Sequence, residues 1–363
     1  MSTPKYDNLF MIKRLEHSPF AIQSINVNVP PEANYNKSVR VLIPKHSDLL
    51  SCGYLKVDLS DTFDKWGTNI LYHLIKKISI SFNELVFAEY SSNDISYFIE
   101  SYKTHETRKM YIKQNVSFIP LHFWFNQNSE NALPLLSLYQ TDIYINIEFG
   151  SIEDIVSDLE SEIPRFPDCI LIFDYVYLHD QERQRFLQNT LEYICHGRVF
   201  LGEFDFNDKI QIININSYVV TNIEIEFICL DLLTEVEALE YLKKYTITIS
   251  KNPWIIGPYN LHFLRFVHSY SYKSSISSRL ILNITFSLDD NNLTPSGFIK
   301  LEDEWQFNIS TDKPDVDIIL ESKLKYRINL NVLNKMFISD GKLNEISMYT
   351  TPSYSTLVPD ESS

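Results

Sequence analysis

The feature that most constrains the fold is a strict alternation of apolar and polar residues that appears in both halves of the chain. The run 142–149 (DIYINIEF) has an apolar residue at every second position, and the run 222–227 (NIEIEF) repeats the pattern. This period of two predicts half-buried β-strands, because successive side chains on a strand point to opposite faces. Two longer stretches, 120–149 and 286–303, each join a polar turn to such a run. The sequence therefore predicts two β modules in series.

Composition supports this prediction. A chain of 363 residues is long enough for two domains that each bury a core. The chain holds 22 Tyr and 23 Phe, and aromatic side chains fit the pleated, half-buried surface of a sheet. Hydrophobic residues at 44% and charged residues at 22% are typical of a folded soluble protein. We therefore expect an all-β fold.

Further strands follow from the same pattern along the chain. Residues 25–29 alternate and end at Pro30-Pro31, which cannot continue a strand. Two runs within 39–59 flank a turn at 45–48, and two runs within 78–88 predict a hairpin across Asn83-Glu84. In the second half, strands are predicted at 169–178, 223–227, 280–286 and 324–332.

A change of pattern marks the expected boundary between the modules. Residues 151–163 carry five acids and no base, and Ser151 and Asp154 have the spacing of a helix capping box. Pro164 and Pro167 bound this segment. The predicted organisation is an N-terminal arm (1–20), a first β module (21–150), a linker with a short helix (151–167), a second β module (168–350) and a loose tail (351–363). Further helical segments are predicted at 179–188 and 234–245.

Several function classes are excluded by charge and by missing motifs. The formal net charge of −15 opposes nonspecific nucleic-acid binding, which depends on Lys and Arg neutralising phosphates. The eight glycines are too dispersed for a phosphate-binding loop, and no GxSxG motif is present. His105-Glu106 lacks the second histidine of a zinc protease helix. Cys195-His196 are adjacent, so on a strand they would point to opposite faces.

The remaining candidate groups are interpreted as structural. Asp289-Asp290 and the pair at 315 and 317 could bind a cation but are more typical of solvated turns. We therefore predict no catalytic, cofactor-binding or metal-binding residue, no cofactor and no enzymatic activity. The cysteines at 52, 169, 195 and 229 have no CxxC spacing and are expected to be buried and reduced. The aromatic cluster Phe123-Trp124-Phe125 could be an exposed anchor, although the core is the favoured interpretation.

Targeting signals are not apparent in the sequence. The first 20 residues lack a signal-peptide core, and no run approaches the roughly 18 apolar residues of a membrane span. We expect a chain that is neither secreted by a standard route nor embedded in a bilayer. Five N-x-[ST] sequons are interpreted as coincidental, and the one at Asn283 lies within a predicted strand.

Five segments, in order, resemble one known family. They are 40–50 (RVLIPKHSDLL), 66–84 (WGTNILYHLIKKISISFNE), 122–149 (from HFWF through ALPLLSLYQ to IEF), 175–193 (YVYLHDQERQRFLQNTLEY) and 286–303 (FSLDDNNLTPSGFIKLED). Together they resemble the double jelly-roll major capsid proteins of nucleocytoplasmic large DNA viruses. At the hairpin, Phe82-Asn83 stands where that family has two glycines.

The resemblance implies two consecutive eight-stranded antiparallel jelly rolls with a few short helices. It also implies a structural virion protein whose homotrimer forms a pseudo-hexagonal capsomer of an icosahedral shell over an internal membrane. The implied partners are neighbouring capsomers and minor capsid or internal membrane proteins, possibly through the N-terminal arm, with no direct nucleic-acid contact. The implied location is the virion, with assembly in the host cytoplasm.

Two alternatives remain open from the sequence. The first is a minor capsid paralogue or a scaffold of immature virions like the poxvirus relative, which would share the fold. The second is a carbohydrate-binding or glycoside-cleaving β-sandwich protein. An exposed row of aromatics beside a cleft with two carboxyls roughly 5–9 Å apart would favour the second alternative. Large apolar side faces would favour assembly.

Overall fold

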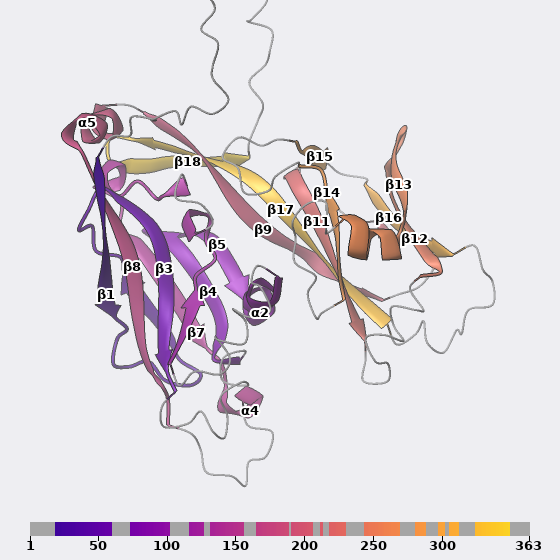
Figure 1. Ribbon diagram of the computed structural model, residues 1–363, viewed down its shortest axis with the longest axis horizontal. Helices are drawn as coiled ribbons and strands as arrows, with labels where there is room; N and C mark the ends of the chain where they lie inside the picture. Colours follow the sequence, from indigo (N-terminus) through magenta and orange to yellow (C-terminus); the bar gives the residue numbers. More distant parts are fainter. Residues whose placement is uncertain are drawn as a thin grey trace, which may run out of the picture.

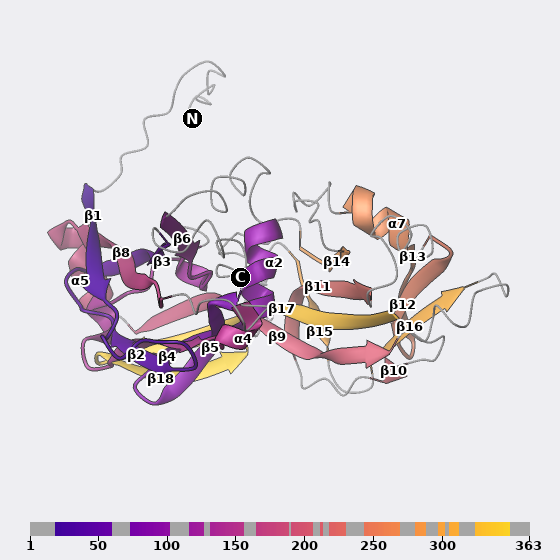
Figure 2. The same cartoon turned by 90° about the horizontal axis from the view of Figure 1, so that it is seen from below.

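The fold was analysed in a computed structural model, and strands dominate it (Figures 1 and 2). The structure describes residues 19–59, 73–101, 116–126, 131–155, 165–188, 190–205, 211–212, 218–229, 243–268, 280–287, 297–301, 305–311 and 324–348. All strand pairings among these residues are antiparallel. The expectation of an all-β fold is confirmed.

The first unit consists of two four-stranded sheets. One sheet has the order β1 (Phe20–Asn28), β8 (Asp168–Leu178), β3 (Leu49–Asp58) and β6 (Val116–Pro120). The other has the order β2 (Ser38–Leu42), β7 (Ile143–Phe149), β4 (Ile75–Phe82) and β5 (Leu85–Ser91). Alternate residues of β7 are buried, as the period of two predicts.

The second unit repeats this arrangement. One sheet is built on β14 (Ile281–Thr285), β11 (Tyr218–Cys229), β17 (Leu324–Ser339) and β18 (Lys342–Met348). In this sheet, β15 (Ile299–Leu301) also pairs with β11, and β9 (Leu191–Asp205) pairs with β17. The other sheet has the order β10 (Gln211–Ile212), β16 (Gln306–Thr311), β12 (Tyr245–Lys251) and β13 (Trp254–Asn260).

The strand order identifies both units as jelly rolls. Counted from β1, the strands of the first unit lie in the orders 1-8-3-6 and 2-7-4-5. In the second unit, β9 to β13 take positions 1 to 5, β14 and β15 share position 6, and β16 and β17 take positions 7 and 8. With this numbering the second unit has the same two orders. Its last strand, β18, is an addition that pairs with β17. Eight strands in two facing antiparallel sheets are the jelly-roll architecture. The chain is therefore a double jelly roll, as the resemblance implies.

The strand β8 corrects the predicted boundary between the units. It was placed at the start of the second module, but it pairs with β1 over nine positions and with β3 on its other side. Leu171, Phe173 and Tyr175 of β8 lie in the hydrophobic cluster of the first unit. The prediction was wrong for residues 168–178 because an apolar run does not specify which sheet a strand joins. The acidic segment and its prolines precede the last strand of the first jelly roll, not the second unit.

Two hydrophobic clusters form the cores, and the strands β9 and β17 contribute residues to both. Residues of β9 near Tyr193 and Cys195 pack in the first cluster, whereas those near Val199 and Leu201 pack in the second. β17 likewise places Met336 in the first cluster, while its earlier residues lie in the second. β9, β17 and β18 appear as one long band that runs from the first unit into the second (Figure 1). The two cores are distinct but share strands.

Two tight turns place residues that tolerate a left-handed backbone at positions with positive φ. Asn83, with φ of 53°, begins the two-residue turn between β4 and β5, which confirms the predicted hairpin. Asn tolerates this left-handed conformation, so it can replace the family's glycine. Asp340-Gly341 connect β17 to β18 with positive φ at both residues. A Cβ on Gly341 would overlap the ring of Tyr139 in the first unit, so this turn also needs glycine for close packing.

The helices in the described part of the chain are short. They are α2 (Ser92–Ser101), α4 (Ile152–Ile155), α5 (Asp180–Gln188), α7 (Leu261–Phe263), the 3-10 turns η1 (Trp124–Asn126) and η3 (Leu136–Leu138), and the π-helical turn η4 (Leu264–His268). Ser151 and Asp154 form the predicted capping box of α4. The helix predicted at 234–245 falls mostly outside the described residues. None of the described helices is both long enough and apolar enough to cross a membrane.

The predicted aromatic core cluster is confirmed, whereas the predicted burial of the cysteines is confirmed only for Cys195 among the described side chains. Phe123, Trp124 and Phe125 are fully buried, and the 3-10 turn η1 lets three consecutive side chains enter the core. Cys52, Cys169 and Cys195 are free thiols, of which Cys195 is buried and the other two are partly buried. The side chain of Cys229 is outside the described part. Asn283 lies in β14 with its side chain buried, as the sequence indicates for that sequon.

The placement of β8 in the first unit can be tested by mutation. Phe173→Ala should destabilise the first jelly roll by about 3–5 kcal/mol because it leaves a cavity in a packed core. Hydrogen exchange measured by mass spectrometry should show lost protection in β1 and β3 before β12 and β16. The matched control is Leu85→Ala on β5, where the side chain is 55% exposed and the change in stability should be less than about 0.5 kcal/mol. Loss of protection confined to the second unit would contradict this assignment.

Candidate functional site at the junction of the two jelly rolls

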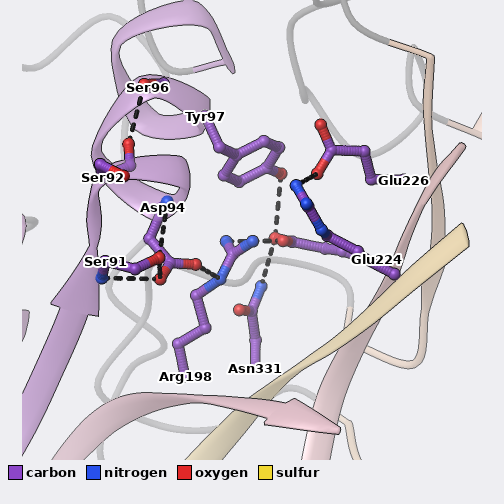
Figure 3. A network of polar contacts seen from close by, with 10 residues as sticks. Ser91, Ser92, Asp94, Ser96, Tyr97, Arg198, Glu224, Glu226 and Asn331 are labelled. Carbon is purple, nitrogen blue, oxygen red and sulfur yellow. Dashed lines mark hydrogen bonds and ion pairs between the residues drawn. The ribbon is translucent and has the colours of Figure 1, made fainter. Parts of the chain in front are cut away.

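A helix start on the first jelly roll holds a carboxylate toward the second. Ser91 precedes α2, and its backbone N–H and its hydroxyl both donate to Oδ2 of Asp94, at 2.9 and 2.6 Å. The backbone N–H of Asp94 donates back to Oγ of Ser91 at 3.4 Å. This reciprocal pattern is a capping box, which satisfies donors that a helix start leaves unpaired. It fixes the Asp94 side chain and leaves Oδ1 directed at the second unit (Figure 3).

Arg198 of β9 meets that carboxylate from the second unit. Its side chain is only 6% exposed, and its Nε lies 2.9 Å from Oδ1 of Asp94. One of its two terminal nitrogens, Nη1, lies 2.6 Å from Oε2 of Glu224 on β11. The guanidinium also stacks over the ring of Tyr97, with Cζ 4.4 Å from the ring centre. A buried cation is thus compensated by two carboxylates and an aromatic face.

We call the group formed by Asp94, Tyr97, Arg198, Glu224 and Asn331 the junction network. Glu224 is its most deeply buried charged residue. Oε1 of Glu224 accepts hydrogen bonds from the hydroxyl of Tyr97 and from Nδ2 of Asn331, both at 2.9 Å. The side chain of Glu224 is 2% exposed. Burial raises the pKa of its carboxyl above the ordinary value, and the Arg198 charge opposes that rise.

The junction network joins α2 of the first unit to β9, β11 and β17 of the second (Figure 3). The contacts between the two units span large sequence separations, for example 127 residues between Tyr97 and Glu224. Breaking such a network would leave a charge buried without a partner, which is strongly unfavourable. The arrangement therefore fixes how the two jelly rolls are oriented.

A second contact region supports the same orientation. The backbone N–H of Gln140, after η3, donates to the carbonyl of Gly341 at 2.9 Å. The hydroxyl of Thr141 accepts from the backbone N–H of Leu343 at 3.2 Å. The hydroxyl of Tyr193 donates to the carbonyl of Ala132 at 2.8 Å. The β17–β18 hairpin and β9 are thus held against the first unit at a place separate from the junction network.

The structure places some of the residues that were weighed for chemistry. Cys195 and His196 both lie on β9, and the Cys195 side chain is buried in the first core. Burial raises the pKa of the Cys195 thiol, which opposes formation of the nucleophilic thiolate. His105-Glu106, Asp289-Asp290 and the acidic pair at 315 and 317 lie outside the described residues. Within the described ranges, His, Cys, Asp and Glu side chains do not cluster in threes that could hold a metal ion.

Sequence reasoning did not identify the junction network. Glu224 occupies a polar position in the alternating run 222–227. This pattern indicates on which face of the strand the Glu224 side chain lies, but it does not indicate which residues cover that face. In the structure this polar face carries buried Asn222, Glu224, Asn283 and Asn329. The available signal was weak: Ser91 and Asp94 have capping-box spacing, but nothing in the sequence pairs them with Arg198.

Comparisons with known proteins agree with the fold. Residues 8–179 match the family model described as major capsid protein N-terminus. The chain is 27% identical over 226 residues to the major capsid protein of Pyramimonas orientalis virus, covering 56% of each protein. It is 25% identical over 236 residues to probable capsid protein 4 of Acanthamoeba polyphaga mimivirus, covering 57% of this chain and 44% of that protein. The matched part spans about half the length of these curated relatives.

Solved structures with the same fold cover nearly the whole chain. VP54 of the virus PBCV-1, fitted into a reconstruction of the virophage Sputnik, superposes with a TM-score of 0.75 at 15% identity, covering 94% of this chain and 100% of that chain. The Faustovirus major capsid protein superposes with a TM-score of 0.72 at 9% identity, covering 92% and 93%. At these identities the likeness concerns the fold alone.

A double-mutant cycle tests the junction network. Arg198→Met should lower the free energy of unfolding by about 3–5 kcal/mol, because it leaves Glu224 buried without its counter-charge. Adding Glu224→Gln should recover part of this loss, because the amide stays hydrogen-bonded without a charge. The control is Arg327→Met, whose partner Glu203 is more exposed and for which we expect a loss of at most about 1 kcal/mol. Urea denaturation measures the wild type, both single variants, the double variant and the control, and additive effects of Arg198→Met and Glu224→Gln would contradict the network.

The raised pKa of Glu224 predicts a pH dependence with a definite sign. The folded-state pKa exceeds the unfolded value of about 4.3, so the folded protein binds more protons between these two pKa values. The stability contributed by Glu224 is fully present below the unfolded pKa and is lost as the pH rises through the folded pKa. The stability of the wild type minus that of Glu224→Gln should therefore fall as the pH rises through this window. Urea titrations between about pH 4 and 8 measure it, and a difference that rises with pH would contradict the prediction.

Proposed function

We propose that this double jelly-roll chain, which is similar in sequence to major capsid proteins of large DNA viruses, is a structural protein of the virion. In this proposal it is a shell protein without enzymatic activity. Three copies form a capsomer with a pseudo-hexagonal outline, and capsomers tile an icosahedral shell over an internal membrane. Assembly takes place in the host cytoplasm, and minor capsid or internal membrane proteins are further partners.

The repeated strand order is the observation that carries this proposal. Both units have the orders 1-8-3-6 and 2-7-4-5, so one chain presents two wedges of similar construction. Three such chains around an axis would present six similar wedges, which is how a trimer can occupy a hexagonal position in a lattice. The junction network supports this proposal because tiling requires the two wedges of each chain to keep one orientation.

Apolar side chains at the two ends of the molecule support a ring-forming contact. Phe20 and Ile22 are 61% and 58% exposed on the edge strand β1. Trp254 and Ile255 are 70% and 69% exposed on the edge strand β13. β1 and β13 lie at opposite ends of the long axis in both views (Figures 1 and 2). A cyclic trimer uses two different surfaces of each chain, so this placement suits a head-to-tail ring.

Other roles share the fold or lack a supporting observation. A minor capsid paralogue or a scaffold of immature virions would have the same two jelly rolls, and imaging of assemblies distinguishes a shell from a scaffold. A glycoside-cleaving protein needs a carboxylic acid and a carboxylate free to act on a sugar. Near the junction of the two units, Asp94, Glu203 and Glu224 are instead paired with arginines. No contact of the described residues favours the carbohydrate alternative.

Assembly state is the direct test. Native mass measurement of the purified protein should give three times the chain mass of 42.6 kDa. Negative-stain electron microscopy should show a three-lobed particle with a hexagonal outline. Trp254→Ser combined with Ile255→Ser should shift the protein toward monomers, because it removes apolar area from the proposed contact.

The matched control for this test is Leu85→Ser on β5, where the leucine is 55% exposed and the strand lies between the two ends that carry β1 and β13 (Figures 1 and 2). This variant should remain trimeric, and far-ultraviolet circular dichroism should show that all variants keep their strands. A stable monomer for the wild type at micromolar concentration would contradict the proposed capsomer. A trimer unchanged by the β13 substitutions would retain the capsomer but reject β13 as its contact.

A further inference from the structure

A groove of about 750 Å³ lies between the two jelly rolls, beside the junction network. Its floor is the outward face of the sheet formed by β9, β17 and β11, which contributes Phe200, Arg327 and Glu226. Its wall on the first unit is β5, which contributes the consecutive residues 86–89. Among the described residues β5 pairs only with β4, so the other edge of β5 borders the groove. A free strand edge can bind an added strand through backbone hydrogen bonds.

The charges that line the groove compensate one another. Each lining carboxylate lies within reach of a cation: Glu89 is 2.7 Å from Lys77, Asp94 is 2.9 Å from Arg198, and Arg327 is 3.0 Å from Glu203 and 3.9 Å from Glu226. These pairs also engage both arginines of the lining. A charged occupant would have to displace one of these ions or remain uncompensated, which is unfavourable where water is partly excluded. The groove therefore suits an uncharged occupant.

Two carboxamides of β17 retain hydrogen-bonding capacity for an occupant. Asn329 lines the groove and is only 6% exposed, and its side chain makes no hydrogen bond to another described residue. Asn334 also lines the groove without such a bond, and its Nδ2 lies so close to Gly197 that a Cβ there would approach it to 2.8 Å. A carboxamide has both donors and an acceptor, so it can pair with a peptide backbone.

Apolar side chains are exposed beside these amides. Phe200 on β9 is 58% exposed, and it lies directly opposite Asn329 in the pairing of β9 with β17. Val86 on β5 is 50% exposed. The groove thus combines apolar surface, amide groups and a free strand edge. An uncharged peptide segment in an extended conformation can contact all three.

The strand β18 ends beside one end of this groove. Its last residue, Met348, pairs with Asn334 of β17, and Asn334 lines the groove. The residues that follow Met348 therefore begin next to the groove. The strand β17 covers about 23 Å between Asn334 and Arg327, whereas eleven extended residues span up to about 36 Å. A segment of that length after Met348 can reach the whole groove.

The residues that follow β18 have the composition that the groove suits. Residues 349–359 read YTTPSYSTLVP and carry no charged side chain. This is the longest run without Asp, Glu, Lys or Arg outside the described residues. Within it, residues 353–358 (SYSTLV) lie between Pro352 and Pro359. Tyr, Thr and Val favour strands, and a proline at each end limits a strand to these six residues.

We propose that residues 353–358 bind in this groove of their own chain as an extended strand paired with the free edge of β5. The apolar side chains of the segment cover Phe200 and Val86, and its backbone also pairs with the carboxamides of Asn329 and Asn334. The bound segment connects the shared sheet to the first jelly roll. This inference goes beyond the proposed shell function, because three chains can form a ring whether or not the segment is bound.

Cross-linking of the full-length chain tests this proposal. One variant carries Val86→Cys in the groove together with Ser355→Cys in the segment, and a short bismaleimide reagent should join the two cysteines within one chain. Adding Leu357→Asp should lower the yield at least about threefold, because the groove does not compensate a further charge. Ser362→Asp adds the same charge outside the segment and should leave the yield unchanged.

The matched control for the groove replaces Val86→Cys by Leu42→Cys, which has a similar exposed fraction on β2 at the other edge of the same sheet. Peptide mapping by mass spectrometry identifies the linked residues, with the background of the native cysteines subtracted. A several-fold higher yield for Val86→Cys supports the proposal. Equal yields at the two positions overturn it. A link found only between chains, when chains with two distinguishable mass tags are mixed, also overturns it.

Hydrogen exchange gives an independent readout on the protein without added cysteines. The amides of residues 353–358 should exchange at least about tenfold more slowly in the full chain than in a synthetic peptide of residues 349–363, because strand pairing protects them. Phe200→Ser should reduce this protection, whereas Phe118→Ser should not, because Phe118 is a 38% exposed residue of β6 outside the groove lining.

Equal exchange in the full chain and in the peptide overturns the proposal. Native mass measurement on the same samples separates this proposal from the proposed capsomer. A trimer whose residues 353–358 are unprotected rejects only the binding of the segment, and a monomer whose residues 353–358 are protected rejects only the capsomer.

Discussion

The pairing of β9 with β17 is the constraint on which the rest of the structure depends. These strands pair from Leu191 to Asp205, and their residues contribute to both hydrophobic clusters. A two-domain chain usually has a linker that leaves its domains free to move. Here the backbone hydrogen bonds of one pair of strands run through both cores, so bending at the junction would break a sheet.

The junction network connects this shared sheet to helix α2 of the first unit. The sheet alone would allow twisting about its length, because strands twist readily. Asp94, held by the cap of α2, and Glu224, held by Tyr97 and Asn331, place two carboxylates on Arg198. Buried ion pairs add little net stability but are sensitive to geometry. The network therefore selects one orientation of the jelly rolls, which suits the proposed role in a lattice.

The sequence by itself determined the all-β class, the duplication, most strand positions, and turns such as Asn83-Glu84. These features depend on local alternation, turn residues and capping chemistry, which each segment carries independently of its neighbours. Only the tertiary structure decided that β8 closes the first jelly roll, that β9 and β17 pass through both cores, and that Glu224 is buried against Arg198. The reason is physical. An alternating pattern indicates that a strand has one apolar and one polar face, but it does not indicate which strand pairs with it or what covers the polar face. Those choices depend on contacts between residues more than a hundred positions apart.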